Sequence, residues 1–103
     1  MEKKAVKILM TWNVRQGREE TYLQYITHEF PAAMLQENLQ PTEAWYTVYG
    51  DWPEVTMGFM ARDLARAEEF LRSRSCAKLR QQLEKYITDY HHKVIPLRRG
   101  FQL

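Results

Sequence analysis

The sequence predicts a single α+β domain whose strands and helices follow the order β-α-β-β-α-β. Three observations carry this prediction: a strictly alternating segment near the start, a hairpin pattern in the middle, and an amphipathic helical pattern on either side of that hairpin. In this order, two right-handed crossovers place both helices on one face of a four-stranded antiparallel sheet, the ferredoxin-like arrangement. The chain has 103 residues, the usual length of one domain, and no linker or repeat divides residues 1–103.

The first third of the chain predicts a strand followed by a long helix. Apolar and polar residues alternate from Val6 to Arg15, a period of two that is typical of a strand. Acidic residues from Glu19 then favour a helix N-terminus, and apolar residues at helical spacing continue the helix for about five turns. Pro31 lacks an amide hydrogen, so we expect a kink or break near residues 28–30. Asn38 can end the helix in the left-handed conformation.

The middle of the chain predicts an antiparallel hairpin. Aromatic and β-branched residues dominate residues 42–49, and a second apolar run covers residues 55–61. Between them, residues 50–53 have the composition of a turn, with a glycine, an aspartate and a proline. Two strands joined by a short loop are therefore expected.

The last third predicts a broken helix and a final strand. Asp63 can cap the helix, whose first apolar stripe consists of Leu64, Ala67 and Leu71, with Phe70 beside it. The stripe lapses at residues 73–75, where a serine can cap a second piece. The apolar side of that piece consists of Cys76, Leu79, Leu83, Tyr86, Ile87 and Tyr90. Residues 92–97 can form the last strand, and Pro96 places that strand at an edge of the sheet.

Composition narrows the possible functions. Fifteen Lys and Arg against thirteen Asp and Glu leave a net charge of +2 with both signs interleaved, so we expect neither nucleic-acid nor membrane partners. No segment approaches the roughly 20 apolar residues of a membrane helix, and no signal-peptide pattern opens the chain. A single cysteine excludes an internal disulfide, which favours a reducing, cytoplasmic setting. Three Trp, six Tyr and four Phe exceed the needs of a minimal core and predict a pocket or an interface.

The sheet face opposite the helices predicts a subunit contact. In the expected topology this face carries Leu9, Trp45, Tyr49, Met60, Ile95 and Leu97. Such a set is too apolar to leave in water, so we expect a second copy of the chain to cover it and form a homodimer. The tail of residues 98–103 ends in two apolar side chains and is expected to be ordered, at the subunit contact or at a pocket rim.

These features resemble the dimeric α/β-barrel superfamily, which includes antibiotic-biosynthesis monooxygenase-like, EthD-like and NIPSNAP-like proteins. The resemblance rests on a first strand ending in Trp12-Asn13, on the helix segment His28-Glu29-Phe30-Pro31, and on a second helix that restarts after a serine-rich break. It implies that two sheets pair into a barrel and that a ligand lies between the sheet and the helices of each subunit.

Trp12 and Asn13 are the candidate catalytic residues under this resemblance. A cofactor-free monooxygenase could use an aromatic wall and an amide that steadies an enolate-like intermediate. Each residue also has a structural explanation, Trp12 as a large core side chain and Asn13 as an amide that satisfies a loop.

The ligand-binding candidates lie on the first helix and the second strand, which flank the usual pocket. They are Tyr22, Tyr25, Phe30, Met34, Trp45 and Tyr46. Tyrosine and tryptophan offer apolar walls with a polar tip, which suits a flat organic ligand, and the same residues could equally form a core.

Neither a metal nor another cofactor is expected. His28 falls on the polar side of its helix and should face solvent unless the kink at Pro31 turns it inward. His91 and His92 are adjacent in a strand, so they face opposite sides and cannot bind one ion together. Cys76 lies on an apolar stripe, where a buried thiol behaves as a small hydrophobic group.

The sequence therefore predicts a small homodimeric protein of unassigned activity that binds a small aromatic or apolar molecule between sheet and helices. The alternative is a cofactor-independent monooxygenase-like enzyme acting on an electron-rich aromatic or polyketide-like substrate. A purely structural or interaction role is the third possibility, and the sequence leaves open whether the protein is an enzyme.

Overall fold

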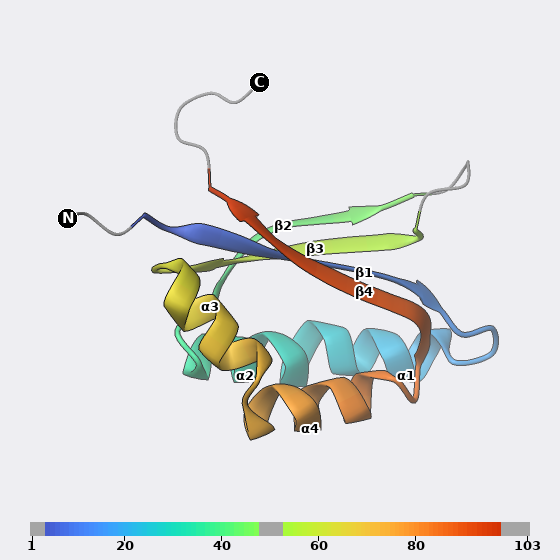
Figure 1. Ribbon diagram of the computed structural model, residues 1–103. Helices are drawn as coiled ribbons and strands as arrows, with labels where there is room; N and C mark the ends of the chain where they lie inside the picture. The colour runs from blue at the N-terminus through green and yellow to red at the C-terminus, as the bar shows by residue number, and fades with distance from the viewer. Residues whose placement is uncertain (1–3, 48–52, 98–103) are drawn as a thin grey trace.

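The sheet and helices form two layers, with the helices on one face of the sheet (Figure 1). The structure is a computed structural model that describes residues 4–47 and 53–97. Its strands are β1 (Val6–Val14), β2 (Gln40–Tyr46), β3 (Val55–Ala61) and β4 (Ile87–Pro96). Its helices are α1 (Glu19–Gln24), a π-helical turn (Tyr25–Glu29), α2 (Phe30–Gln36), α3 (Leu64–Leu71) and α4 (Arg74–Leu83).

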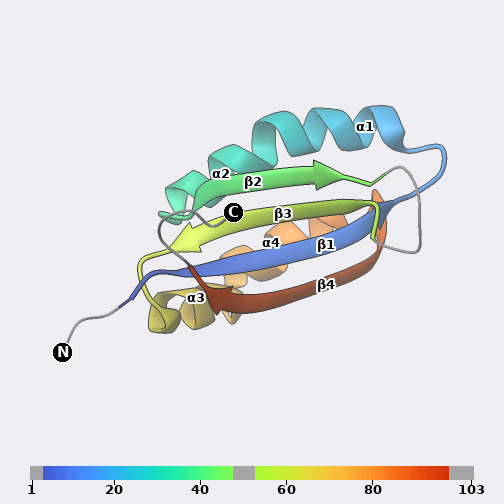
Figure 2. The ribbon, with the colours of Figure 1, turned by 90° about the horizontal axis from the view of Figure 1, so that it is seen from above.

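The strands lie in the order β2-β3-β1-β4, and each is antiparallel to its neighbours (Figure 2). The two central strands are the first and third along the chain, which is the topology that two crossovers over one face produce. The predicted ferredoxin-like α+β fold is confirmed. Pro41 and Pro96 both lie on edge strands, where a missing amide hydrogen is tolerated.

The first helix is interrupted just before Pro31, as predicted. Residues 25–29 form a π-helical turn, and the amide of Phe30 donates to the carbonyl of Tyr25 instead of that of Ile26. A proline cannot donate a backbone hydrogen bond, so the ladder must be rearranged around it. Asn38 ends α2 with a φ of 62°, the expected left-handed conformation.

The hairpin is present, with β2 beginning at Gln40, two residues earlier than expected. Pro41 precedes a register shift against β3, and this irregularity lets the edge strand include the proline. The expected turn after residue 49, together with Tyr49 itself, falls on residues 48–52, and the predicted role of the tail falls on residues 98–103. Both lie outside the described residues.

The broken second helix and its two caps are confirmed. The side chain of Asp63 accepts a hydrogen bond from the amide of Arg66, and Ser73 accepts one from the amide of Cys76. Leu64, expected in the apolar stripe, is the first residue of α3 and is half exposed.

The boundary between the last helix and the last strand differs from the prediction. The helix ends at Leu83 and β4 begins at Ile87, whereas the apolar pattern predicted helix through Tyr90 and strand only from residue 92. Ile87 and Tyr90 both lie in β4 and face the helices. Because they are three residues apart, the sequence alone predicts that they lie on one side of a helix. Asp89, with a φ of 57°, lies where the register of β1 and β4 shifts, and this irregularity gives Ile87 and Tyr90 their non-alternating spacing.

The core lies between the helices and the helix-facing side of the sheet. Its fully buried large side chains are Ile8, Trp12, Phe30, Met34, Leu39, Phe70, Leu83 and Ile87. Cys76 is buried as expected, and burial raises the pKa of its thiol although Arg80 acts in the opposite direction. In the described part of the chain, no helix has both the length and the apolar character needed to cross a membrane.

Candidate functional site

The sheet face that carries no helix presents three transverse rows of side chains, because directly paired residues point to the same side of a sheet. The first row is Trp45, Thr56, Thr11 and His91; the second is Glu43, Gly58, Leu9 and Lys93; the third is Gln40, Met60, Lys7 and Ile95. We call this surface the open face. Of the residues expected there, Leu9, Trp45, Met60 and Ile95 lie on it.

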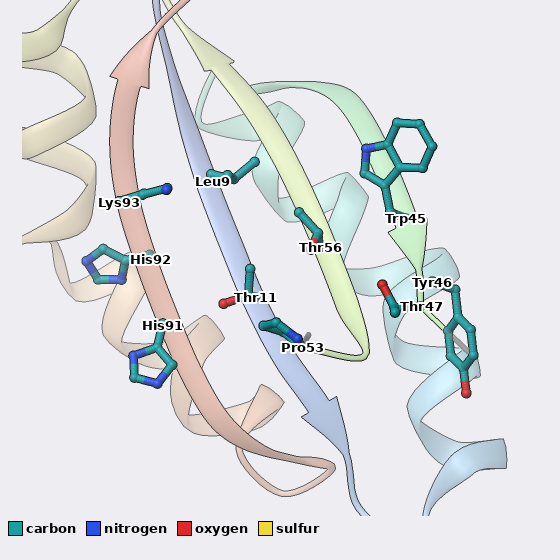
Figure 3. A pocket seen from close by; sticks show the side chains of 10 residues that line it. All are labelled: Leu9, Thr11, Trp45, Tyr46, Thr47, Pro53, Thr56, His91, His92 and Lys93. Carbon is teal, nitrogen blue, oxygen red and sulfur yellow. The ribbon is translucent and has the colours of Figure 1, made fainter. Parts of the chain in front are cut away.

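A hollow of about 570 Å³ lies over the first two rows of the open face (Figure 3). Small side chains of β1 and β3, such as Thr11 and Thr56, form its floor. Trp45 stands at one side on β2, and Lys93 reaches over the sheet from β4 on the other (Figure 3). Trp45 is 64% exposed, which is high for so large an apolar side chain. The hollow therefore has an aromatic wall, a floor with hydroxyl groups, and basic residues opposite.

An ion pair lies next to this hollow on the same face. Lys7 Nζ and Glu43 Oε1 are 2.7 Å apart, across β3. Gly58 makes the approach possible, since a Cβ at this position would lie 2.8 Å from Glu43 Oε1 and 2.6 Å from Thr42 Oγ1. Partial burial raises the pKa of the Glu43 carboxyl, but hydrogen bonds from Lys7 and Thr42 outweigh this and hold the pKa below its ordinary value.

Trp12 is a core residue. Its side chain is completely buried, and its indole nitrogen donates to the hydroxyl of Tyr22 at 3.1 Å. Its ring packs edge-on against Phe30 and nearly parallel to Tyr90, with centroid distances of 6.2 and 6.3 Å. These contacts leave Trp12 no exposed surface for a substrate in this conformation.

Asn13 connects two parts of the sheet. Its Oδ1 accepts from the amide of Glu54 at 2.9 Å, and its Nδ2 donates to Asp89 Oδ2 at 3.1 Å. The side chain thus joins the residue before β3 to the bulge of β4. Both the oxygen and the nitrogen of the amide are therefore hydrogen-bonded within the protein, as in the structural explanation of Asn13 as an amide that satisfies a loop.

The six ligand-binding candidates do not come together around one cavity. Tyr22, Tyr25, Phe30 and Met34 are buried in the core, and the Tyr25 hydroxyl donates to the carbonyl of Leu79 at 3.3 Å. Burial raises the pKa of Tyr22 and Tyr25, the latter to about 12. The space between sheet and helices around Phe30, Met34 and Tyr90 measures only about 10 Å³.

Trp45 and Tyr46 lie apart from the four buried candidates. Trp45 is on the open face, whereas Tyr46 pairs with Val55, so its side chain leaves the opposite side of the same edge strand. Tyr46 nevertheless lines the hollow together with Trp45 (Figure 3). The Tyr46 hydroxyl donates to Glu54 Oε1 at 2.6 Å, and this bond to a carboxylate raises the pKa of the tyrosine. Both side chains are exposed.

The histidines are placed as expected. His28 is exposed, with Nδ1 3.1 Å from the carbonyl of Gln24. His91 pairs with Thr11 and His92 with Met10, so their rings leave opposite faces of β4. Within residues 4–47 and 53–97, no group of three or more His, Cys, Asp or Glu side chains is arranged to hold a metal ion.

The sequence reasoning missed Thr11, Thr56, His91 and Lys93 as residues of the hollow. Their signal is the period of two in each strand, combined with the order of the strands. The early start of β4 at Ile87, which the sequence pattern did not indicate, is what places His91 and Lys93 opposite Thr11 and Leu9.

The sequence itself matches no protein-family model and no curated protein. Solved structures do match. A NIPSNAP family protein of unknown function from Agrobacterium tumefaciens has a TM-score of 0.69 at 12% identity, covering 100% of this chain and 96% of that one. The cofactor-independent oxygenase SnoaB from Streptomyces nogalater has a TM-score of 0.68 at 11% identity, with coverages of 97% and 99%.

A third structure is described as a dimeric protein of unknown function with a ferredoxin-like fold, from Bacteroides fragilis. Its TM-score is 0.61 at 9% identity, covering 90% of this chain and 96% of that one. Identities this low show the fold alone. The neighbours are nevertheless the groups that the sequence resembles, so the resemblance is confirmed at the level of fold.

Proposed function

We propose that this protein is a homodimer that binds a small aromatic molecule on the open face of its sheet. The observation that carries the proposal is the hollow of about 570 Å³ beside Trp45, on a face without helices. Its volume lies within the roughly 300–1,000 Å³ typical of sites for small organic ligands. Trp45 supplies a surface on which a flat ring can stack, and Thr11 and Thr56 supply hydroxyl groups.

Pairing of two open faces is supported by what that face carries. Leu9, Met60 and Ile95 lie on it with the exposed Trp45, and no helix of residues 4–47 and 53–97 covers them. Two sheets that pack face to face lie about 10 Å apart, so the partner's sheet would cover the hollow and enclose a ligand bound in it. The ferredoxin-like neighbour from Bacteroides fragilis, described as dimeric, gives independent support.

The proposal moves the ligand from the position expected from sequence, between sheet and helices. At the edge of that space, a recess of about 290 Å³ lies between α2 and β2, about half the volume of the open-face hollow; it is lined by residues that include Phe30, Pro31, Ala44, Met57 and Phe59. Deeper in, around Phe30, Met34 and Tyr90, the free space is about 10 Å³, no larger than the roughly 10–15 Å³ that one water needs. A ligand there would have to displace side chains such as Phe30 and Met34, which are fully packed. The open face requires no such rearrangement.

The ligand site can be tested with the neutral fluorescent aromatic amine N-phenyl-1-naphthylamine as the probe. We expect saturable binding by the wild-type protein, weaker binding by Trp45→Ala, and near wild-type binding by Trp45→Phe, which keeps a ring. Leu35→Ala, which also removes an exposed apolar side chain but lies on α2, is the matched control. Equal binding by Trp45→Ala and Leu35→Ala would contradict the proposal.

A cofactor-independent monooxygenase-like enzyme is the second candidate, favoured by the aromatic cluster around Trp12 and by the fold shared with SnoaB. It requires the core to open, because Trp12 is completely buried. The test is oxygen consumption with electron-rich polycyclic phenols. Turnover that Trp12→Phe abolishes would favour the enzyme, and no consumption by the wild type leaves the binding protein as the better account.

A further inference from the structure

A second concave site lies on the helix side of the sheet, between α4 and β4, away from the open face. It is a groove of about 380 Å³ whose polar lining includes Arg72, Ser73, Arg80, Gln81, Glu84 and His92. The volume again falls in the range of sites for small ligands. The groove shares one lining residue, His92, with the open-face hollow, whereas Arg72 and Arg80 line the groove and not the hollow. Variants at the two arginines therefore test the groove without changing the hollow.

Arg80 is held in place at this groove by two contacts. Its guanidinium carbon lies 4.3 Å from the centroid of the Tyr90 ring, and its Nε donates to Glu84 Oε2 at 3.2 Å. Tyr90 is itself packed against the buried Trp12. An arginine carries five N–H donors, and the two terminal amino groups of Arg80 have no partner among the described residues. The guanidinium is therefore preorganised with its outer donors unused.

His92 supplies a further donor. Its Nδ1 lies 3.1 Å from the hydroxyl of Tyr90. Burial raises the pKa of Tyr90, so the phenol keeps its proton; burial and the charge of Arg80 lower the pKa of His92, which favours its neutral form. When Tyr90 donates to Nδ1, neutral His92 carries its own proton on Nε2, and that N–H is left for another acceptor.

The charge of the groove is positive. Arg72 adds a second guanidinium, which makes no ion pair within the described part of the chain, and Gln81 adds an amide. The carboxylate in the lining, Glu84, is already bound to Arg80. Leu71 and Ala77 complete the wall with apolar surface. The groove thus offers several N–H donors and excess positive charge beside an apolar patch.

We infer that this groove binds a small organic molecule through an oxyanion, a carboxylate or a phosphate group, with Arg72 and Arg80 as its cationic partners and His92 as a hydrogen-bond donor. Both anions match the planar fork of an arginine, and hydrogen bonds between charged groups are about twice as strong as neutral ones. The apolar wall accommodates the body of the ligand.

Nuclear magnetic resonance titration tests this site with three probes of similar size: benzoate, phenyl phosphate and neutral benzyl alcohol. We expect at least one anion to shift the Nε–H signals of Arg72 and Arg80 saturably, and benzyl alcohol to leave them unchanged, since neither arginine lines the open-face hollow. The stronger of the two anions identifies which oxyanion the groove prefers. No saturable shift with either anion, or an equal response to benzyl alcohol, overturns the proposal.

Variants assign the binding to named residues. Arg80→Gln should weaken binding of the preferred anion by about tenfold or more, since a charge-assisted hydrogen bond is lost. Arg72 is exposed and makes no ion pair within the described residues, so Arg72→Gln should weaken binding without affecting folding. This variant keeps the test decisive if Arg80→Gln proves unstable. Arg18→Gln, an exposed arginine outside the groove, is the control for net charge. Equal weakening by Arg18→Gln and Arg72→Gln contradicts the assignment.

Discussion

Replacing Leu83 by alanine tests the core that supports both candidate sites. Leu83 lies in the last turn of α4 and is 1% exposed. The substitution removes three carbon atoms, which at about 0.8 kcal/mol each corresponds to about 2.4 kcal/mol of lost transfer free energy. The cavity that the substitution leaves adds to this loss. The side chains around Leu83 are tightly packed, with only about 10 Å³ of free space, so they cannot move far enough to fill the cavity. We expect a loss of about 3–5 kcal/mol in the free energy of unfolding.

Urea denaturation followed by circular dichroism measures this loss as a lower midpoint with an unchanged slope. Leu23→Ala is the matched control, since Leu23 is also helical but 55% exposed, and it should change stability by less than about 0.5 kcal/mol. Both variants must be compared at one protein concentration, because association contributes to stability. If Leu83→Ala denatures at the wild-type midpoint, α4 does not pack on the sheet as described.

Three further predictions concern the Lys7–Glu43 ion pair and the buried Tyr25. Gly58→Ala should lower the melting temperature by forcing Glu43 away from Lys7, at a cost of about 1–3 kcal/mol, and an unchanged melting temperature would show that the pair tolerates a Cβ. Folding lowers the pKa of Glu43 below its ordinary value of 4.5, so the Lys7–Glu43 pair stabilises the fold fully above pH 4.5. This stabilisation should be lost as the pH falls below 4.5, and melting temperatures measured over a series of pH values would show the loss. Burial, with the charge of Glu29, raises the pKa of Tyr25 to about 12 from 10.0, so stability should fall as pH rises from 10 towards 12 and should fall less in Tyr25→Phe. Equal alkaline losses in the two proteins would refute the Tyr25 assignment.

Local chemistry was enough to predict most elements of the fold. The alternation through β1 depends only on which face meets the core, and the break at Pro31 follows from a missing amide hydrogen. The caps at Asp63 and Ser73 follow from the geometry of a helix N-terminus. Each of these signals comes from neighbouring residues, so the tertiary structure did not need to be known.

The start of β4 and the composition of the candidate site depend on tertiary structure. Ile87 and Tyr90 face the helices from a bulged strand, and their spacing alone does not distinguish a strand from a continued helix. Likewise, the helical spacing of Phe30 and Met34 indicates that these side chains face the sheet. It does not indicate whether the space between helix and sheet is empty or filled. Arg80 and His92 are brought together only by the packing of α4 on β4.

The pairing of two open faces is the central claim, and the molar mass in solution tests it most directly. Multi-angle light scattering of the full chain at micromolar concentration should give about twice 12.4 kDa. Met60→Lys should lower the mass to 12.4 kDa with helical content unchanged, because it places a charge in the third row of the open face. A wild-type mass of 12.4 kDa would contradict the account.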